Sequence, residues 1–151
     1  MELKLVWHKP VALREAEART NLLYELDLEK IPATPGVYIF MRTFGKNQNP
    51  LYVGKAKNLG SRIKGQLNTL KLMRGIQNAA HGSRVLVFGE FVPKQAQRVD
   101  KCLTLIERAL IRHFLSEGHE LLNKAGTRLA KHSLLSEQVA GRFVPHKILF
   151  E

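Results

Sequence analysis

The stretch from residue 35 to residue 62, PGVYIFMRTFGKNQNPLYVGKAKNLGSR, decides the fold. Val37 to Thr43 is rich in β-branched and aromatic residues, which predicts a strand, and Leu51 to Gly54 predicts a second, short strand. The residues between them, Phe44 to Pro50, predict a turn. The pair is therefore expected to form a hairpin with a long connection.

The segments that follow the hairpin predict helices and a third strand. Asn58 predicts the N-cap of a helix from Leu59 to about Met73. Val85 to Val92 predicts the third strand, which Pro93 ends. Gln95 to Leu115 has the strongest helical periodicity of the chain, with an apolar stripe of Val99, Leu103, Ile106, Leu110 and Phe114.

The two ends of the chain predict smaller elements. Upstream, Leu3 to Trp7 predicts a short strand, and Val11 to Leu28 predicts a helix after Pro10. Downstream, Thr127 to Ala140 predicts a short helix and Lys147 to Phe150 a final strand. Together these elements predict an α/β (α+β) domain with a small three-stranded, mainly antiparallel sheet flanked by helices.

The charge of the chain is its most unusual property. There are 24 Lys and Arg against 13 Asp and Glu, a formal net charge of +11, and no acid occurs from Ile31 to Gly89. That stretch holds the basic residues Arg42, Lys46, Lys55, Lys57, Arg62, Lys64, Lys71, Arg74 and Arg84. A solvated face normally mixes signs, so this pattern indicates a surface that faces phosphate. The alternative is a basic protein kept soluble by its own charge.

Cysteine content and hydropathy restrict the compartment. The single cysteine, Cys102, excludes an internal disulfide and fits a reducing compartment. No apolar run is long enough to span a bilayer, and the N-terminal residues lack the design of a signal peptide. We therefore expect a cytoplasmic protein with no membrane partner, nucleoid-associated if its source is bacterial.

The familiar enzyme motifs are missing from the sequence. It contains no Gly-rich nucleotide loop, no Cys/His spacing for zinc, no HExxH and no GxSxG. The common hydrolase and oxidoreductase signatures are therefore excluded, and any chemistry must come from other residues.

One set of residues has the chemistry that phosphodiester hydrolysis requires: an activated water, a cation on the developing charge and help for the leaving oxygen. Tyr38 and Tyr52 lie on paired strands, where their hydroxyls can converge. A phenol is a poor base unless nearby cations lower its pKa, and Lys55 and Arg62 can supply those cations. Arg62 also suits bidentate contact with phosphate. Glu107 is an acid within a helix, and one carboxylate suffices for a single Mg²⁺.

The same residues resemble the GIY-YIG nuclease family, and within it the N-terminal nuclease domain of the excision-repair protein UvrC and its relatives. There the run reads PG-x-Y in one strand and then YVGKAKNL-x-x-R. This chain has Pro35-Gly36-Val37-Tyr38, then Tyr52 to Leu59, and Arg62 at the expected spacing. The resemblance continues through Glu107 in LIERALIRHF and ends near Asn123 in ELLN.

The resemblance implies three parts in the chain. Residues 1–30 are an N-terminal extension with a strand and a helix, and residues 31–123 are a GIY-YIG nuclease-like domain. Residues 124–151 are expected to be a basic C-terminal extension packed on the same domain.

The resemblance also implies an activity and a site, namely a metal-dependent DNA endonuclease of DNA repair that uses Mg²⁺ or Mn²⁺. Tyr38 would be the general base, or would share the task with Tyr52, and Lys55 would tune the tyrosines. Arg62 would hold the scissile phosphate, Glu107 would bind the metal at the leaving-group side, and Asn123 would complete the site by hydrogen bonding. The residues expected to contact nucleic acid are Lys55, Lys57, Asn58, Arg62, Lys64, Gln66, Lys71 and Arg74.

Three features depart from the family pattern. Four residues after the motif arginine the family usually has Tyr or His, but this chain has Gln66, which cannot act as an acid or base. The spacing from Tyr38 to Tyr52 is longer than in the repair proteins, and Asn123 comes later after Glu107.

Structural explanations stay open for each site residue. Tyrosines in strands often serve packing, and Lys55 and Arg62 are ordinary solvated charges in many proteins. Glu107 has Arg108 and Arg112 as candidate ion-pair partners. Asn123 is also suited to capping or turning the chain after the helix.

Three functions therefore compete, and we rank them in this order. The first is a metal-dependent DNA endonuclease, with RNA as an alternative substrate. The second is a catalytically silent nucleic-acid-binding module of the same fold, which Gln66 favours. The third is a regulatory protein whose basic surface meets an acidic protein. Because one active site cuts one strand at a time, a double-strand cut would require a homodimer or a protein partner.

Overall fold

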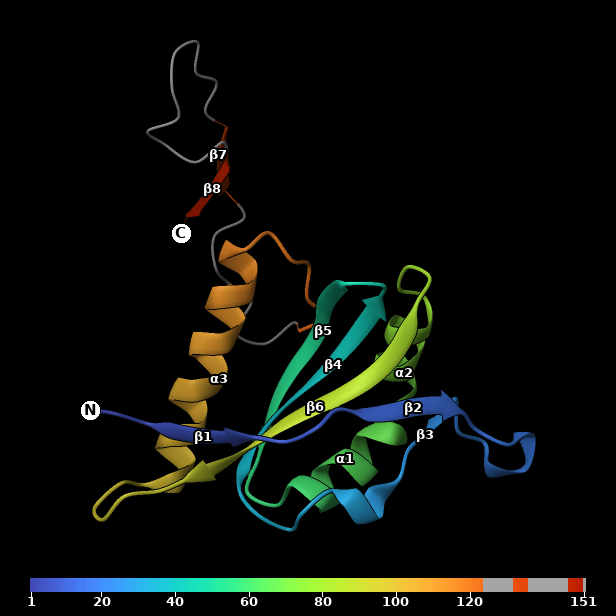
Figure 1. The fold of residues 1–151 in the computed structure, drawn as a ribbon, viewed down its shortest axis with the longest axis horizontal. Coiled ribbons are helices and arrows are strands. Elements are labelled where there is room, and N and C mark those ends of the chain that lie inside the picture. The colour runs from blue at the N-terminus through green and yellow to red at the C-terminus, as the bar shows by residue number, and fades with distance from the viewer. Residues whose placement is uncertain (124–131, 136–146, 151) are drawn as a thin grey trace.

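A computed structural model describes residues 1–123, 132–135 and 147–150. Its centre is an antiparallel sheet built on β4 (Gly36–Phe44), β5 (Asn47–Ala56) and β6 (Ser83–Val92), as shown in Figure 1. Three N-terminal strands extend the sheet: β1 (Lys4–Trp7), β2 (Val11–Glu15) and β3 (Tyr24–Glu25). The strand order is β3-β2-β6-β4-β5, with β1 also paired to β6, so β5 forms one edge of the sheet.

Helices cover the two faces of this sheet. Their bounds are α1 (Leu59–Leu67), α2 (Leu70–Gln77) and α3 (Val99–Ser116), with short 3-10 turns at Ala18–Thr20 and Leu28–Lys30. Side chains alternate along β4, so Tyr38 and Phe40 pack in the cluster that contains α1 and α2. Val37 and Ile39 pack instead against α3. The fold class predicted from the sequence is confirmed.

The helix predicted from Val11 to Leu28 is wrong. Val11 and Leu13 are buried on alternate positions of β2, which pairs with β6. The following residues are good helix formers, but the backbone turns at Asn21, which has a φ of 57°. Pairing to the open edge of β6 therefore overrides local helix propensity, and the sheet has six strands rather than three.

Other predicted boundaries also differ from the structure. The helix expected from Leu59 to Met73 is broken at Asn68 and Thr69 into α1 and α2. The turn expected from Phe44 to Pro50 shortens to Gly45 and Lys46, because Phe44 pairs with Asn47. Gly45 has a φ of 59°, which a glycine adopts without strain.

The C-terminal predictions fall mostly outside the described residues. Within the range predicted as the helix Thr127 to Ala140, residues His132–Leu135 form a strand, β7, and the others lie outside the described part. The final strand is confirmed as β8 (Lys147–Phe150), which pairs antiparallel with β7. None of the described helices combines the length and apolar character needed to cross a membrane.

Arg84 is a buried cation that holds the end of α2. Its guanidinium donates to the carbonyls of five residues at distances of 2.8–3.5 Å: Ile76, Gln77, Ala79, Ala80 and Gly82. These oxygens lie at and beyond the helix C-terminus, where backbone acceptors lack partners within the helix. Arg84 is therefore not part of the phosphate-facing set that the sequence suggested.

We predict that Arg84→Met lowers the free energy of unfolding by about 2–4 kcal/mol, because it leaves several buried carbonyls without donors. Urea unfolding followed by circular dichroism measures the change. The matched control is Arg74→Met, at an exposed position on α2, with an expected change within about 0.5 kcal/mol. Equal stability of the two variants would contradict this role of Arg84.

Candidate active site

Gly54 allows the side chain of Tyr38 to reach the edge of the sheet. The two residues are opposite each other in the β4–β5 ladder. A Cβ atom on Gly54 would lie 2.2 Å from Cζ of Tyr38 and 2.3 Å from its hydroxyl oxygen. The phenol ring therefore passes directly over the glycine, and any side chain at position 54 would block its path.

Gly36 makes a second close approach possible. A Cβ atom there would lie 2.2 Å from the carbonyl oxygen of Gly89 and 2.8 Å from Cδ1 of Leu59. Leu59 begins α1, whose N-cap is Asn58 as predicted: the Asn58 side chain accepts a hydrogen bond from the amide of Ser61 at 3.1 Å. The two motif glycines thus set the positions of the tyrosine and of α1.

The two tyrosines lie side by side and share a partner from α1. Their ring centroids are 6.3 Å apart. Nε2 of the buried Gln66 donates to the hydroxyl of Tyr38 at 2.7 Å and lies 3.5 Å from that of Tyr52. Oε1 of Gln66 accepts from the Thr69 hydroxyl at 3.3 Å. Tyr38 is fully buried whereas Tyr52 is half-buried, so substrate reaches Tyr52 more readily in this conformation.

Arg62 links the tyrosines to the opposite face of the sheet. Burial raises the pKa of Tyr38, while Gln66 and then Arg62 oppose that rise. In turn, interaction with Tyr38 raises the pKa of Arg62, to which Tyr52 and Glu107 also contribute. The exposed guanidinium of Arg62 is therefore within electrostatic reach of both phenols and of the carboxylate on α3.

Lys55 and Glu107 form the α3 side of the site. Nζ of Lys55 donates to the hydroxyl of Thr104 at 2.6 Å, one helical turn before Glu107. Burial raises the pKa of Glu107, and the charges of Lys55, Arg108 and Arg62 oppose the rise. The ion pairs found within residues 1–123 involve other carboxylates, and Arg108, one of the two candidate partners, acts on Glu107 through its charge.

The donor set at this place suits a hard divalent cation held by few protein ligands. No group of three or more His, Cys, Asp or Glu side chains is gathered in the described part of the chain, which argues against a closed zinc-type site. Glu107 is a half-buried carboxylate that forms no hydrogen bond with described residues. Mg²⁺ commonly uses one or two carboxylates, several waters and substrate phosphates.

Asn123 binds the backbone of β5 from outside the sheet. Its Oδ1 accepts from the amide of Val53 at 2.8 Å, and its Nδ2 donates to the Val53 carbonyl at 2.6 Å. The amide of Leu122 also donates to the carbonyl of Leu51 at 2.6 Å. Asn123 thus satisfies the open edge of β5 between Tyr52 and Gly54 with both its amide oxygen and its amide nitrogen.

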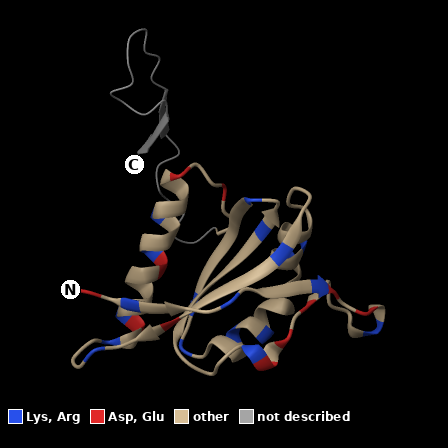
Figure 2. Ribbon diagram, viewed as in Figure 1, with Lys and Arg blue, Asp and Glu red and all other residues tan. Residues whose placement is uncertain are grey.

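The remaining predicted nucleic-acid contacts surround this edge. Figure 2 shows no acidic position on β4, β5, α1 or α2. The exposed members of the predicted set are Lys57, Asn58, Arg62, Lys64, Lys71 and Arg74, whereas Lys55 is half-buried and Gln66 is internal. Lys71 and Arg74 line a groove with Tyr52 and Gln66, and Lys55 and Lys57 line a hollow with Lys101 on the α3 side.

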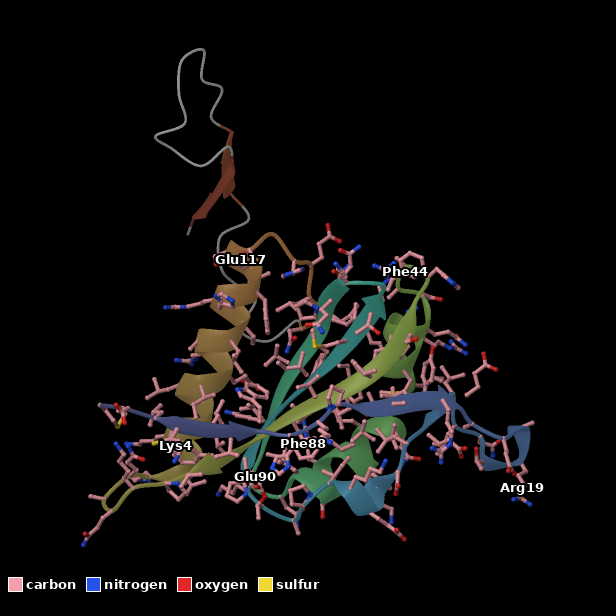
Figure 3. The ribbon with its side chains drawn as sticks, viewed as in Figure 1. Lys4, Arg19, Phe44, Phe88, Glu90 and Glu117 are labelled. Atoms are coloured by element: carbon pink, nitrogen blue, oxygen red, sulfur yellow. The ribbon has the colours of Figure 1, made fainter. Side chains whose placement is uncertain are left out.

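A separate polar cluster lies at the start of β4, away from this edge. Glu90 of β6, labelled with Phe88 in Figure 3, accepts from the Thr34 hydroxyl at 2.7 Å and pairs with His8 at 3.0 Å. The hydrogen bond from Thr34, followed by that from His8, lowers the pKa of Glu90. The His8 ring stacks on Phe88 with centroids 4.8 Å apart. This cluster ties the entry loop of β4 to β6 and the N-terminal strands.

Two polar residues that hold side chains of the site were not among the residues predicted from the sequence. Thr69 orients Gln66, and Thr104 holds Lys55. The signal for Thr69 was the pair Asn68-Thr69, a combination typical of a helix boundary. Thr104 carried no signal, because threonine on a helix face is common and its partner comes from a distant strand.

Comparison with known proteins gives a partial similarity. Over 62 residues the chain is 42% identical to the UvrABC system protein C of Thermotoga petrophila (strain ATCC BAA-488 / DSM 13995 / JCM 10881 / RKU-1), covering 39% of this chain and 10% of that protein. Over 41 residues it is 49% identical to the UvrABC system protein C of Petrotoga mobilis (strain DSM 10674 / SJ95), covering 27% and 7%. The match thus spans a tenth or less of each relative. No family model matches the chain. No solved structure matches it either.

We predict that Gly54→Ala lowers the free energy of unfolding by about 1–3 kcal/mol, because the added methyl overlaps the Tyr38 ring. The matched control is Gly65→Ala, within α1, where a Cβ atom meets nothing within 4 Å. That substitution is expected to stabilise the protein by about 0.5–1 kcal/mol. Thermal unfolding of both variants measures the difference, and a harmless Gly54→Ala would refute the close packing.

We also predict that Glu107→Gln raises stability at neutral pH. Because burial holds the pKa of Glu107 above its ordinary value of 4.5, ionisation is less favourable in the folded state than in the unfolded state. The wild type therefore loses stability relative to the variant as pH rises through the folded pKa, and the two converge below pH 4.5. Urea unfolding across this pH range measures the difference, with Glu117→Gln at the exposed C-cap residue of α3 as control. A constant difference at all pH values would contradict the prediction.

Proposed function

We propose that this chain is a metal-dependent DNA endonuclease that hydrolyses phosphodiester bonds at the β5 edge. The observation that supports this most is the electrostatic contact among five side chains from four elements: Tyr38, Tyr52, Lys55, Arg62 and Glu107. A single set of charges and phenols lies on both sides of one sheet edge, and the stretch from Ile31 to Gly89 that supplies all of them but Glu107 contains no acid. That combination suits a phosphate group that must be held and attacked.

Each side chain has a defined task in this proposal. Arg62 is exposed, and its planar guanidinium binds the scissile phosphate and stabilises the charge that develops on it. The tyrosine pair accepts the proton of the attacking water, which forms the new phosphorus–oxygen bond as the bond to the leaving oxygen breaks. Lys55, held by Thr104, contributes positive charge between the phosphate and the carboxylate.

Glu107 is the residue that would hold Mg²⁺ or Mn²⁺. Its half-buried carboxylate faces Lys55 and Arg62. Burial raises the pKa of this carboxyl, and a bound cation would favour its ionised form, which is the form that binds metal. When bound, the ion supplies positive charge for the leaving oxygen. Asn123 positions the site by fixing the β5 backbone between Tyr52 and Gly54.

Charge and similarity together favour DNA as the substrate. The groove with Lys71 and Arg74 and the hollow with Lys57 and Lys101 flank the site on its two faces, so a strand crossing the edge meets basic residues on both sides. The partial similarity to UvrABC system protein C supports a role in DNA repair. RNA is the alternative substrate that the same charges accommodate.

The second candidate function is a silent nucleic-acid-binding module of the same fold. Gln66 favours it, because an amide neither accepts nor releases a proton at the position where the family has Tyr or His. This candidate keeps the basic surface and loses strand scission.

The test is nicking of supercoiled plasmid at low salt with Mg²⁺ or Mn²⁺. Wild type is expected to nick, and Glu107→Gln and Arg62→Ala are expected to lower the rate by at least about 100-fold, because each removes charge stabilisation from the transition state. The nicking rates of Tyr38→Phe and Tyr52→Phe are compared to determine which tyrosine acts as the general base. The matched control is Glu117→Gln, at the C-cap just beyond α3, which is expected to leave nicking unchanged.

Binding of the same DNA, measured in parallel, separates the two candidates. If wild type binds DNA in a salt-dependent way but cuts with neither metal, the endonuclease is refuted and the binding module replaces it. If Glu107→Gln cuts as well as wild type, the assignment of the metal ligand is wrong.

A further inference from the structure

The groove that runs along α2 is continuous with the candidate active site. Its volume is about 880 Å³, within the range of about 300–1,000 Å³ that is common for small-molecule sites. Tyr52 and Gln66 belong both to the site and to the lining of the groove. A group bound in the groove therefore lies directly beside the tyrosine pair.

One face of α2 forms a wall of this groove. Lys71, Arg74, Gly75 and Asn78 follow one another at intervals of three and four residues, so they share one side of the helix. Leu122 packs on the bare backbone of Gly75, where a Cβ atom would lie 2.9 Å from Cδ1 of the leucine. The wall thus has an apolar centre between polar side chains.

The lining combines exposed apolar surface with polar groups that have no partner among the described residues. Leu70 and Leu122 are 50% and 38% exposed, which is high for leucines that line a groove. The side chains of Lys71, Arg74 and Asn78 form no hydrogen bond or ion pair with other described residues. No acid is among the described residues that line the groove. The groove therefore suits an apolar group that carries hydrogen-bonding atoms and has negative charge next to it.

A nucleobase with its flanking phosphates has this combination of properties. Its flat face can stack on the half-buried ring of Tyr52, and such stacking tolerates any of the bases. Its edge can pair with the amide of Asn78, which offers both a donor and an acceptor. Its phosphates meet Lys71 and Arg74. A base that is paired within a duplex presents neither its face nor its pairing edge to a protein groove.

We propose that this groove is a subsite for one unpaired nucleobase of the bound strand, stacked on Tyr52 with its edge toward Asn78. Arg62 and Gln66 are one helical turn apart on α1, so the base belongs to a nucleotide next to the phosphate that Arg62 holds. That position relative to the cut rests on the proposed endonuclease function, whereas binding of the base requires no cutting. In an intact duplex the base must first leave its pair, which costs free energy.

The test is binding of three short duplexes to the full chain without divalent metal, followed by fluorescence anisotropy. The duplexes differ at one position, which holds a bulged thymidine, a bulged abasic nucleotide or no bulge. The abasic bulge keeps the distortion of the backbone and lacks only the base. We expect the thymidine bulge to bind about 5- to 150-fold more tightly than the abasic bulge, which is the range for one base stacked on an aromatic ring.

Two pairs of variants locate this preference for the base. Tyr52→Leu is expected to abolish most of it, whereas Phe44→Leu removes an exposed ring outside the groove and leaves it unchanged. Asn78→Ala is expected to lower it by about 2- to 10-fold, the effect of one hydrogen bond. Gln77→Ala, at the exposed neighbouring position outside the lining, leaves it unchanged. If Tyr52→Leu does not fold, the pair at positions 77 and 78 still decides the question.

Photochemical crosslinking places the base directly. A 5-iodouracil in the bulge, which crosslinks to aromatic side chains that it touches, is expected to label Tyr52. Equal affinity for the thymidine and abasic bulges would overturn the proposal, as would crosslinks confined to residues outside the groove. A preference for the base without plasmid nicking rejects the endonuclease alone, whereas nicking without that preference rejects the subsite alone.

Discussion

The contact between the Tyr38 ring and Gly54 is the constraint on which the rest of the site depends. Neighbouring strands lie about 4.8 Å apart, so a tyrosine on β4 reaches the sheet edge only if the β5 residue beside it has no side chain. This requirement explains why Tyr38 of the Gly-x-Tyr run is paired with Gly54 of the Tyr-x-Gly run. Once the hydroxyl lies at the edge, α1 must start close by, which the second glycine, Gly36, permits. Arg62 and Gln66 then come from the same helix to the same oxygen.

A sheet edge is a vulnerable place for such a site, because its unpaired backbone groups attract other strands. Here the side-chain amide of Asn123 pairs with the backbone of Val53, in the middle of the site strand. The side chains on the two faces of β5 thus stay accessible to a phosphate, while the backbone of Val53 is already hydrogen-bonded. The charge distribution follows the same logic: one carboxylate, Glu107, lies among cations, and burial disfavours its ionised form. In the proposed function, a bound metal cation would favour that ionised form. Stability and the proposed metal-binding role are therefore opposed at this residue.

The hairpin, α3 and the positions of the main site residues could be predicted, because their signals are local: strand composition around Tyr38, an N-cap at Asn58 and a long apolar stripe in α3. The strand β2 could not, since the residues after Val11 favour a helix locally and only pairing to the open edge of β6 makes them a strand. The break at Thr69 was missed for the same reason, because its benefit lies in a contact with Gln66. Arg84 appeared to be one more surface cation until its carbonyl partners were placed around it.

In the proposed function, one metal ion and one phosphate meet at the side chains of Arg62, Lys55 and Glu107. The most direct measurement is the broadening that Mn²⁺, a paramagnetic ion, causes in the backbone amide NMR signals of the protein with a short DNA oligonucleotide bound. We expect the strongest broadening at Lys55, Thr104 and Glu107, and its loss in Glu107→Gln. Broadening centred on the acids of the N-terminal segment, or unchanged by Glu107→Gln, would contradict it.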